Sequence, residues 1–133
     1  MHLEAARRLR DAEADACRGL DVRESAINLF REVGRVVEVE RIVSSRLRSG
    51  QLLSGAVLVV APRPGIALDD LCRRVDCHLA HVAVAGGSKD DPLALPNERV
   101  DVTTSGANLV VTIRTREGSG GDVLRASQHL IER

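Results

Sequence analysis

The sequence predicts an α+β fold: a single domain in which a mixed four-stranded sheet carries helices on one face, in a ferredoxin-like, split βαβ arrangement. The run 55–61 is apolar and rich in β-branched residues, which is typical of a buried strand, and the amphipathic pattern from Leu68 to Ala83 is typical of a helix. Two further strand patterns, at 99–104 and 109–115, flank a turn, and a helical pattern closes the chain. With 133 residues, the chain has the length of one domain.

The N-terminal segment is predicted to be helical. Residues 3–18 are strong helix formers with only a thin apolar stripe, so this helix is expected to be largely solvated and to end at Gly19. Asp21 and Glu24 match a capping box and predict a second, short helix through about Val33. The predicted domain spans 1–133, with a helical segment at 1–34 and the sheet and its helices at 35–133.

Residues 35–43 are compatible with two structures. The helical spacing of Phe30, Val33 and Val37 would let the second helix continue. Yet five of these nine residues are β-branched, and valines alternate with charged residues, so we interpret the segment as a strand. Residues 44–54 then form the loop of a wide hairpin into the strand at 55–61.

A proline-rich turn separates the central strand from the central helix. Pro62, Pro64 and Gly65 end the strand, and Gly86 with Gly87 ends the helix. One stripe of this helix is apolar and is expected to face inward: Leu68, Leu71, Cys72, Val75, Leu79, Val82 and Ala83.

The C-terminal part is predicted to add a hairpin and a helix. Its elements are strands at 99–104 and 109–115, a turn at 105–108 and a helix at Val123–Glu132. Asp122 is the expected N-cap of that helix. A right-handed crossover from the strand at 55–61 places the last strand between the other two, which leaves 35–43 at the outer edge of the sheet.

The composition argues against several classes of function. The net charge is zero and Phe30 is the only aromatic residue, so neither nucleic acid nor an anionic membrane is an expected partner. No apolar run approaches the roughly 18–20 residues of a membrane span. Met1 leads directly into a charged segment, which predicts a cytoplasmic protein with reduced thiols, or a periplasmic one if an export leader has been removed.

One stretch of the central helix resembles a known group of proteins. The string VDCHLA at 75–80, after a strand that ends in a Pro-Gly turn, is similar to a group of small uncharacterised bacterial proteins. The similarity extends to DACRGL at 15–20, to the pair Pro92-Leu93 and to the Ser105-Gly106 turn. The resemblance implies one domain and supplies no activity. Members of that group often carry export leaders, which this sequence does not show.

The central helix also carries the candidate metal ligands. Cys77 and His81 are four residues apart and share a helix face on the predicted solvent side, with His78 at its border. Thiolate and imidazole suit zinc or copper. Cys72 lies about 140° from Cys77 around the helix, within the apolar stripe, and is interpreted as a small buried hydrophobe.

The cysteines leave three states open. Three free thiols without metal are the expected state. In an oxidising compartment Cys17 can instead pair with Cys77, closing a loop of about 60 residues and adding about 4 kcal/mol on the chain-entropy estimate. A metal site at Cys77 excludes that bridge, because a disulfide sulfur offers no thiolate. A structural metal site would need a fourth ligand from elsewhere, and the remaining soft donors are Cys17, His129 and His2.

The function expected from these observations is a non-enzymatic protein-binding or assembly module of a bacterial cell. Its partner would be another protein or a second copy of the chain, and the candidate surface is the uncovered sheet face around Val110, Thr112 and the β-branched residues of 35–43. We name no catalytic residue and no cofactor-binding residue. The alternative is a metal-binding or thiol redox protein that uses Cys77, His78 and His81.

Overall fold

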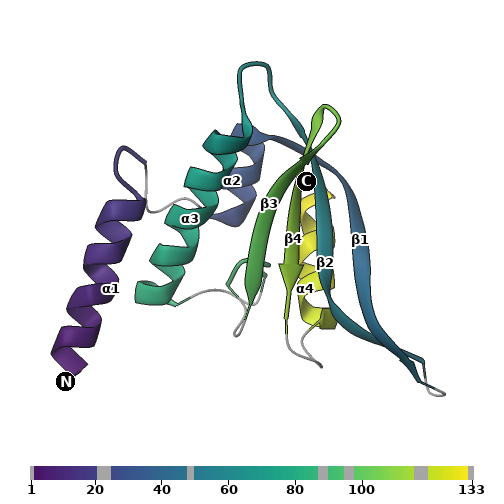
Figure 1. Ribbon diagram of the computed structural model, residues 1–133, viewed down its shortest axis with the longest axis horizontal. Helices are drawn as coiled ribbons and strands as arrows, with labels where there is room; N and C mark the ends of the chain where they lie inside the picture. Colours follow the sequence, from purple (N-terminus) through teal and green to yellow (C-terminus); the bar gives the residue numbers. More distant parts are fainter. Residues whose placement is uncertain are drawn as a thin grey trace.

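The computed structural model describes residues 2–20, 25–47, 50–86, 90–94, 98–115 and 120–131, and it forms an α+β fold (Figure 1). In chain order its helices and strands are α1 (His2–Ala16), α2 (Ala26–Val33), β1 (Gly34–Leu47), β2 (Gly50–Pro62), α3 (Leu68–Ala85), β3 (Arg99–Ser105), β4 (Asn108–Arg114) and α4 (Gly120–Ile131). None of the described helices combines the length and apolarity that a bilayer span requires.

The four strands form one open sheet in the order β1-β2-β4-β3. This order confirms that the last strand lies between the two strands that flank α3 and that residues 35–43 form an edge strand. Every neighbouring pair is antiparallel, so the sheet is antiparallel rather than mixed. The strands β2 and β3 run in the same direction, but β4 separates them.

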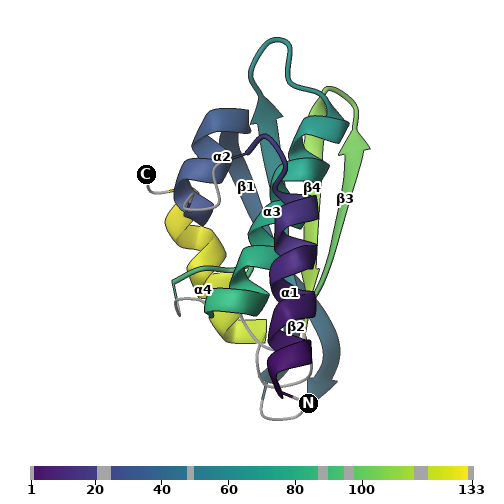
Figure 2. The ribbon, with the colours of Figure 1, turned by 90° about the vertical axis from the view of Figure 1, so that its left-hand side faces the viewer.

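One face of the sheet carries the core. Alternate residues of β2 (Ala56, Leu58 and Val60) and of β4 (Leu109, Val111 and Ile113) are buried on this face. Apolar side chains of α2, α3 and α4 join them in a single cluster. Figure 2 looks onto this face and shows the helices in front of the strands. The expected placement of helices on one face is confirmed.

The helix α1 forms a further layer outside α3 (Figures 1 and 2). Its side chains are almost all exposed, including Leu3 at 84% and Leu9 at 41%. Between Leu3 and Ala16, the half-buried residues are Ala6, Glu13 and Ala16, and Cys17, just after the helix, is buried. The expectation of a largely solvated first helix is therefore confirmed, and the apolar burial that holds α1 is small.

The hairpin between β1 and β2 is longer than predicted. Residues 44–54 were expected to form a loop, but β1 continues to Leu47 and β2 begins at Gly50, with Leu47 opposite Gly50. The pairing of β1 with β2 has three register shifts, which are bulges or irregularities, between Val36 and Glu38, between Ile42 and Val43, and between Val43 and Ser45. The backbone ladder needs no particular side chains, so it continues through a stretch whose serines and glycine locally favour a turn.

Helix starts also differ from the sequence pattern. Ser25 caps α2, because its Oγ accepts a hydrogen bond from the Asn28 amide at 3.3 Å. The predicted capping box at Asp21 and Glu24 lies outside the described residues. The helix α4 begins at Gly120, so Asp122 occupies its first turn instead of the predicted N-cap.

Close backbone approach explains the early start of α4. A Cβ atom on Gly120 would lie 2.2 Å from the carbonyl carbon and oxygen of Leu53, so only glycine lets the helix begin against β2. A glycine also ends the helix α3: its C-cap is Gly86, as predicted, with a φ of 78° that favours glycine. The predicted second stop at residue 87 lies outside the described residues.

Candidate functional site

The first candidate site is the contact between α1 and α3. Cys17 and Cys77 form a disulfide whose Cα atoms are 4.5 Å apart, and both residues are 4% exposed. The expectation of three free thiols is therefore wrong, and the alternative pairing is the one that forms. Cys77 was expected to face solvent; α1 covers that side of α3 and buries it.

Two polar contacts accompany the disulfide. His81 Nδ1 lies 3.1 Å from Glu13 Oε2, which joins the two helices one turn from the bridge. The guanidinium of Arg73 donates a hydrogen bond to the carbonyl oxygen of Arg18 at 3.1 Å. Because both contacts are partly or fully exposed, each contributes little to stability compared with the disulfide. We call this set of contacts, from Cys17, Cys77, Glu13, His81, Arg18 and Arg73, the α1 clamp.

His78 lies about 100° around α3 from Cys77, outside the α1 clamp, and is only 7% exposed. Its Nε2 atom lies 2.5 Å from Asp91 Oδ2, and the other oxygen of Asp91 accepts a hydrogen bond from the Leu93 amide at 2.9 Å. Pro92 and Leu93 are buried beside it. The contact between His78 and Asp91 therefore holds residues 90–94 against the core. It also gives each of these two largely buried polar groups a partner.

The predicted metal ligands do not converge. Cys77 is bonded to Cys17, His78 contacts Asp91, and His81 contacts Glu13. Within the described ranges, no three His, Cys, Asp or Glu residues are placed to hold one metal ion. The three residues proposed as zinc or copper ligands thus have separate partners: Cys77 and His81 both face α1, whereas His78 contacts Asp91. Cys17 is likewise taken up by the disulfide.

The remaining thiol is poorly suited to nucleophilic chemistry. Cys72 is half-buried in α3. Burial raises the pKa of its thiol, and the charges of Asp76 and Asp69 raise it further. A raised pKa keeps the thiol protonated at neutral pH, whereas a nucleophile requires thiolate. Cys72 was predicted to be a small buried hydrophobe, and in the structure it is only half-buried.

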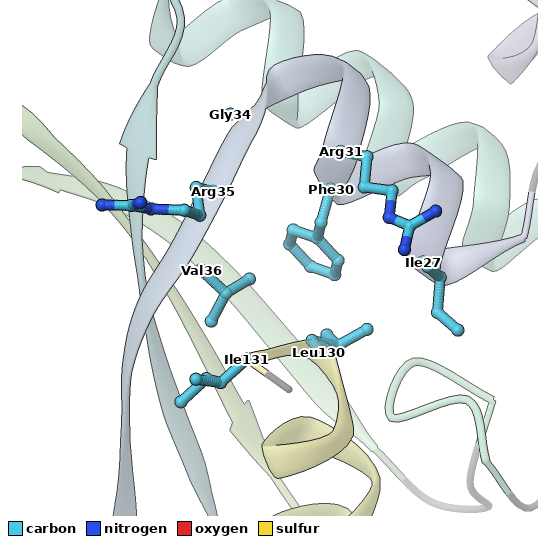
Figure 3. Close-up of a pocket in the computed structure, with 8 residues that line it drawn as sticks. All are labelled: Ile27, Phe30, Arg31, Gly34, Arg35, Val36, Leu130 and Ile131. Carbon is cyan, nitrogen blue, oxygen red and sulfur yellow. The ribbon is translucent and has the colours of Figure 1, made fainter. Parts of the chain in front are cut away.

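A small pocket lies where α2, β1 and the end of α4 meet (Figure 3). Phe30, Val36 and Leu130 form its walls and belong to the hydrophobic core. Figure 3 shows the guanidinium of Arg35 directed away from Phe30. Because its walls are core side chains, we interpret the pocket as the end of the core and assign it no ligand.

The second candidate site is the face of the sheet turned away from the helices, which we call the open face. Strand register places Val57 and Val59 of β2 beside Thr112 and Val110 of β4, and all four are half-buried. The helices contribute to the core on the other face, which also includes Val36 and Val39 of β1; these two β-branched residues were expected on the open face. Exposed charged residues on both edge strands surround this centre: Glu38, Glu40, Arg99, Asp101 and, at the end of β4, Arg114.

Two of these charged residues interact. A side-chain hydrogen bond with Glu40 raises the pKa of the Glu38 carboxyl, and the charge of Glu40 raises it further. On the opposite edge, Arg99 Nε lies 3.6 Å from Asp101 Oδ2. The open face therefore has an apolar centre, an acidic margin on β1 and a margin of both signs on β3, which is the distribution found in protein interfaces.

Sequence reasoning missed the partners Glu13 and Asp91. Glu13 has a detectable signal, since it precedes Cys17 by one helical turn and shares its face. Asp91 has none that local patterns reveal, because it approaches His78 only after the chain has turned beyond α3.

The chain was compared with known proteins in three ways. No protein-family model, no curated protein and no solved structure matches it. The similarity of VDCHLA to a group of bacterial proteins stays a prediction, and the functional conclusion rests on the geometry.

Proposed function

We propose that the protein is a non-catalytic assembly module that associates with a second copy of itself through its sheet. The observation that carries this proposal is the open face, where Val57, Val59 and Val110 are left half-buried in the described part of the chain. An apolar centre with a charged margin is suited to contact with another protein.

The charge balance favours a second copy as the partner. Lysine and arginine together number 19, as do aspartate and glutamate, so the net charge at pH 7 is zero. Copies of a neutral protein do not repel one another at long range, and neutrality favours self-association. The open face itself presents both signs, with Glu38 and Glu40 on one margin and Arg99 and Arg114 near the other. A strongly charged partner would find no matching field on such a surface.

The test is the molar mass in solution, measured by light scattering from about 1 µM to about 500 µM protein, which detects association free energies from about −8 to about −4.5 kcal/mol. We expect the mass to rise to that of a dimer. The Cys72→Ser variant is the matched control, since it removes the free thiol that would otherwise cross-link copies. A wild-type chain that stays monomeric throughout this range overturns the proposal.

The disulfide favours a second candidate function, in thiol redox chemistry. Reduction by a dithiol proceeds through a mixed disulfide with Cys17 or Cys77; it transfers two electrons and leaves both sulfurs as thiols while the reductant becomes a disulfide. The apolar burial of α1 is small, and isolated helices of about 15 residues are marginal in water, so α1 would leave α3 on reduction. Such bridges persist in oxidising compartments.

Limited proteolysis with and without dithiothreitol tests this second function. The arginines of α1 are already exposed, so we expect reduction to release the helix and let trypsin cleave its backbone, while the sheet stays resistant. The Cys17→Ser/Cys77→Ser variant should be cleaved in the same way without reductant, and Cys72→Ser should behave as wild type. Equal protection of α1 in the oxidised and reduced proteins would show that the bridge does not control this helix.

A further inference from the structure

In the described part of the chain, both edge strands of the sheet have backbone groups that pair with no neighbouring strand, but the two edges differ in how they are protected. An edge strand presents a row of N–H and C=O groups on which another chain can pair, and natural edges are often blocked by bulges or charges. The strand β1 has three register shifts against β2 and carries exposed charged residues on the open face. The strand β3 pairs with β4 over seven consecutive residues without a shift.

The strand β3 is well suited to pairing. Four of its seven residues are β-branched, namely Val100, Val102, Thr103 and Thr104, and its described span contains no proline. Val100 and Val102 lie on the helix side and are only half-buried. Figure 2 shows β3 at a margin of the sheet, with no drawn helix beyond it. An added strand would cover these valines and satisfy the outward backbone groups.

We infer that β3 pairs antiparallel with β3 of a second copy, which joins the two four-stranded sheets into one continuous sheet. This inference rests on the proposed self-association; it places the contact at the β3 edge, where it extends the open face across both copies rather than covering it. A two-fold axis at Val102 places each residue opposite its symmetry mate. The facing pairs are Arg99 with Ser105, Val100 with Thr104, Asp101 with Thr103, and Val102 with itself. No two like charges are directly opposite in this register.

The same operation is unfavourable at β1. A two-fold axis at Val39 would set Glu38 of each copy opposite Glu40 of the other. These two carboxyls already interact within one chain, where Glu40 raises the pKa of Glu38. Pairing would gather four carboxyls at one place, and like charges directly opposite destabilise a sheet. The charge pattern thus selects β3 as the pairing edge.

The pairing brings one residue of each copy next to a specific charge. Thr103 is exposed on the open face and would lie opposite Asp101 of the second copy. In Thr103→Glu, the new carboxylate would face the carboxylate of Asp101 in the second copy. This repulsive pair occurs twice in the dimer because of the two-fold symmetry. Thr103→Lys sets a cation there instead. The two variants alter the same exposed position within the monomer, so their difference reports on the residue across the interface.

The experiment is sedimentation equilibrium of these variants. Relative to wild type, we expect Thr103→Glu to raise the dimer Kd roughly 2- to 30-fold and Thr103→Lys to lower it over a similar range. In Asp101→Arg/Thr103→Glu the facing pair has opposite signs, as it has in Thr103→Lys, so its Kd should fall below the wild-type value. Val37→Glu, at an exposed position on β1, is the control and should leave the Kd unchanged. Circular dichroism confirms that each variant is folded.

The outcomes separate the inference from the function on which it rests. A dimer whose Kd is the same in Thr103→Glu and Thr103→Lys overturns the β3 pairing and leaves self-assembly standing. Weakening by Val37→Glu, with no effect at Thr103, transfers the interface to β1 and also overturns the inference. A wild-type protein that never associates overturns both.

Discussion

The core and α1 are held to the same chain by different means. The sheet and α2, α3 and α4 share one cluster of buried apolar residues, so their cohesion is spread over many contacts. The helix α1 buries little apolar surface and is held against α3 mainly by the α1 clamp, which consists of one disulfide and two polar contacts. We therefore expect two different responses to mutation. Removing a core side chain should lower the stability of the whole fold, whereas removing a clamp contact should affect only the packing of α1.

The largest effect is expected in the core. Leu58 is fully buried at the centre of β2, and Leu58→Ala should lower the free energy of unfolding by roughly 2–5 kcal/mol, because it leaves a cavity in addition to the lost transfer free energy. Urea denaturation measures this change. The neighbouring Val57→Ala, on the open face, is the control and should cost less because Val57 is only half-buried. Equal losses at both positions would mean that the open face is covered in solution.

A much smaller effect is expected in the clamp. Glu13→Gln keeps the size of the side chain and replaces the carboxylate that contacts His81 Nδ1, which should cost roughly 0.2–1 kcal/mol, as partly exposed polar contacts of this kind do. Amide hydrogen exchange should show faster exchange in α1 and unchanged exchange in β2 and β4. Acceleration throughout the sheet would contradict the separation of α1 from the core.

The smallest effect is expected at the exposed margin of β1. The pKa of Glu38 is raised in the folded chain by Glu40, so the folded state holds this proton more tightly than the unfolded state. The resulting stabilisation is present at low pH and is lost as the pH rises through the raised pKa. Glu40→Gln should lower the pKa of Glu38 toward its ordinary value, as an NMR titration of the side-chain carboxyl would show. An unchanged titration would mean that the two carboxyls do not interact in solution.

The core was largely predictable from the sequence, because periodicity records which side of an element is buried. Leu58 and Val111 follow the alternation of strands, and Leu71 with Val75 follows the spacing of a helix. The β-branched content of 35–43 correctly indicated β1. The end of that strand was predicted wrongly, since the ladder between Leu47 and Gly50 is a property of two strands together.

The clamp was much less predictable, for a physical reason. Local patterns indicated that Cys77 points away from the apolar stripe of α3, but they do not reveal what lies there. Packing of α1 on that side converts an apparently exposed thiol into a buried bridge and gives His81 the partner Glu13. Contacts between residues 60 or more positions apart leave no periodic signal in either segment.

The position of the disulfide along the chain allows it to form before synthesis of the chain is complete. Cys17 and Cys77 both precede β3 and β4, so a chain that emerges from the ribosome or through a translocon presents both thiols before the second hairpin exists. At that stage β2 has β1 on one side and no strand on the other. Oxidation at this stage would enclose α2, β1 and β2 in a covalent ring, and β4 would complete the sheet by adding to the outside of that ring without threading through it.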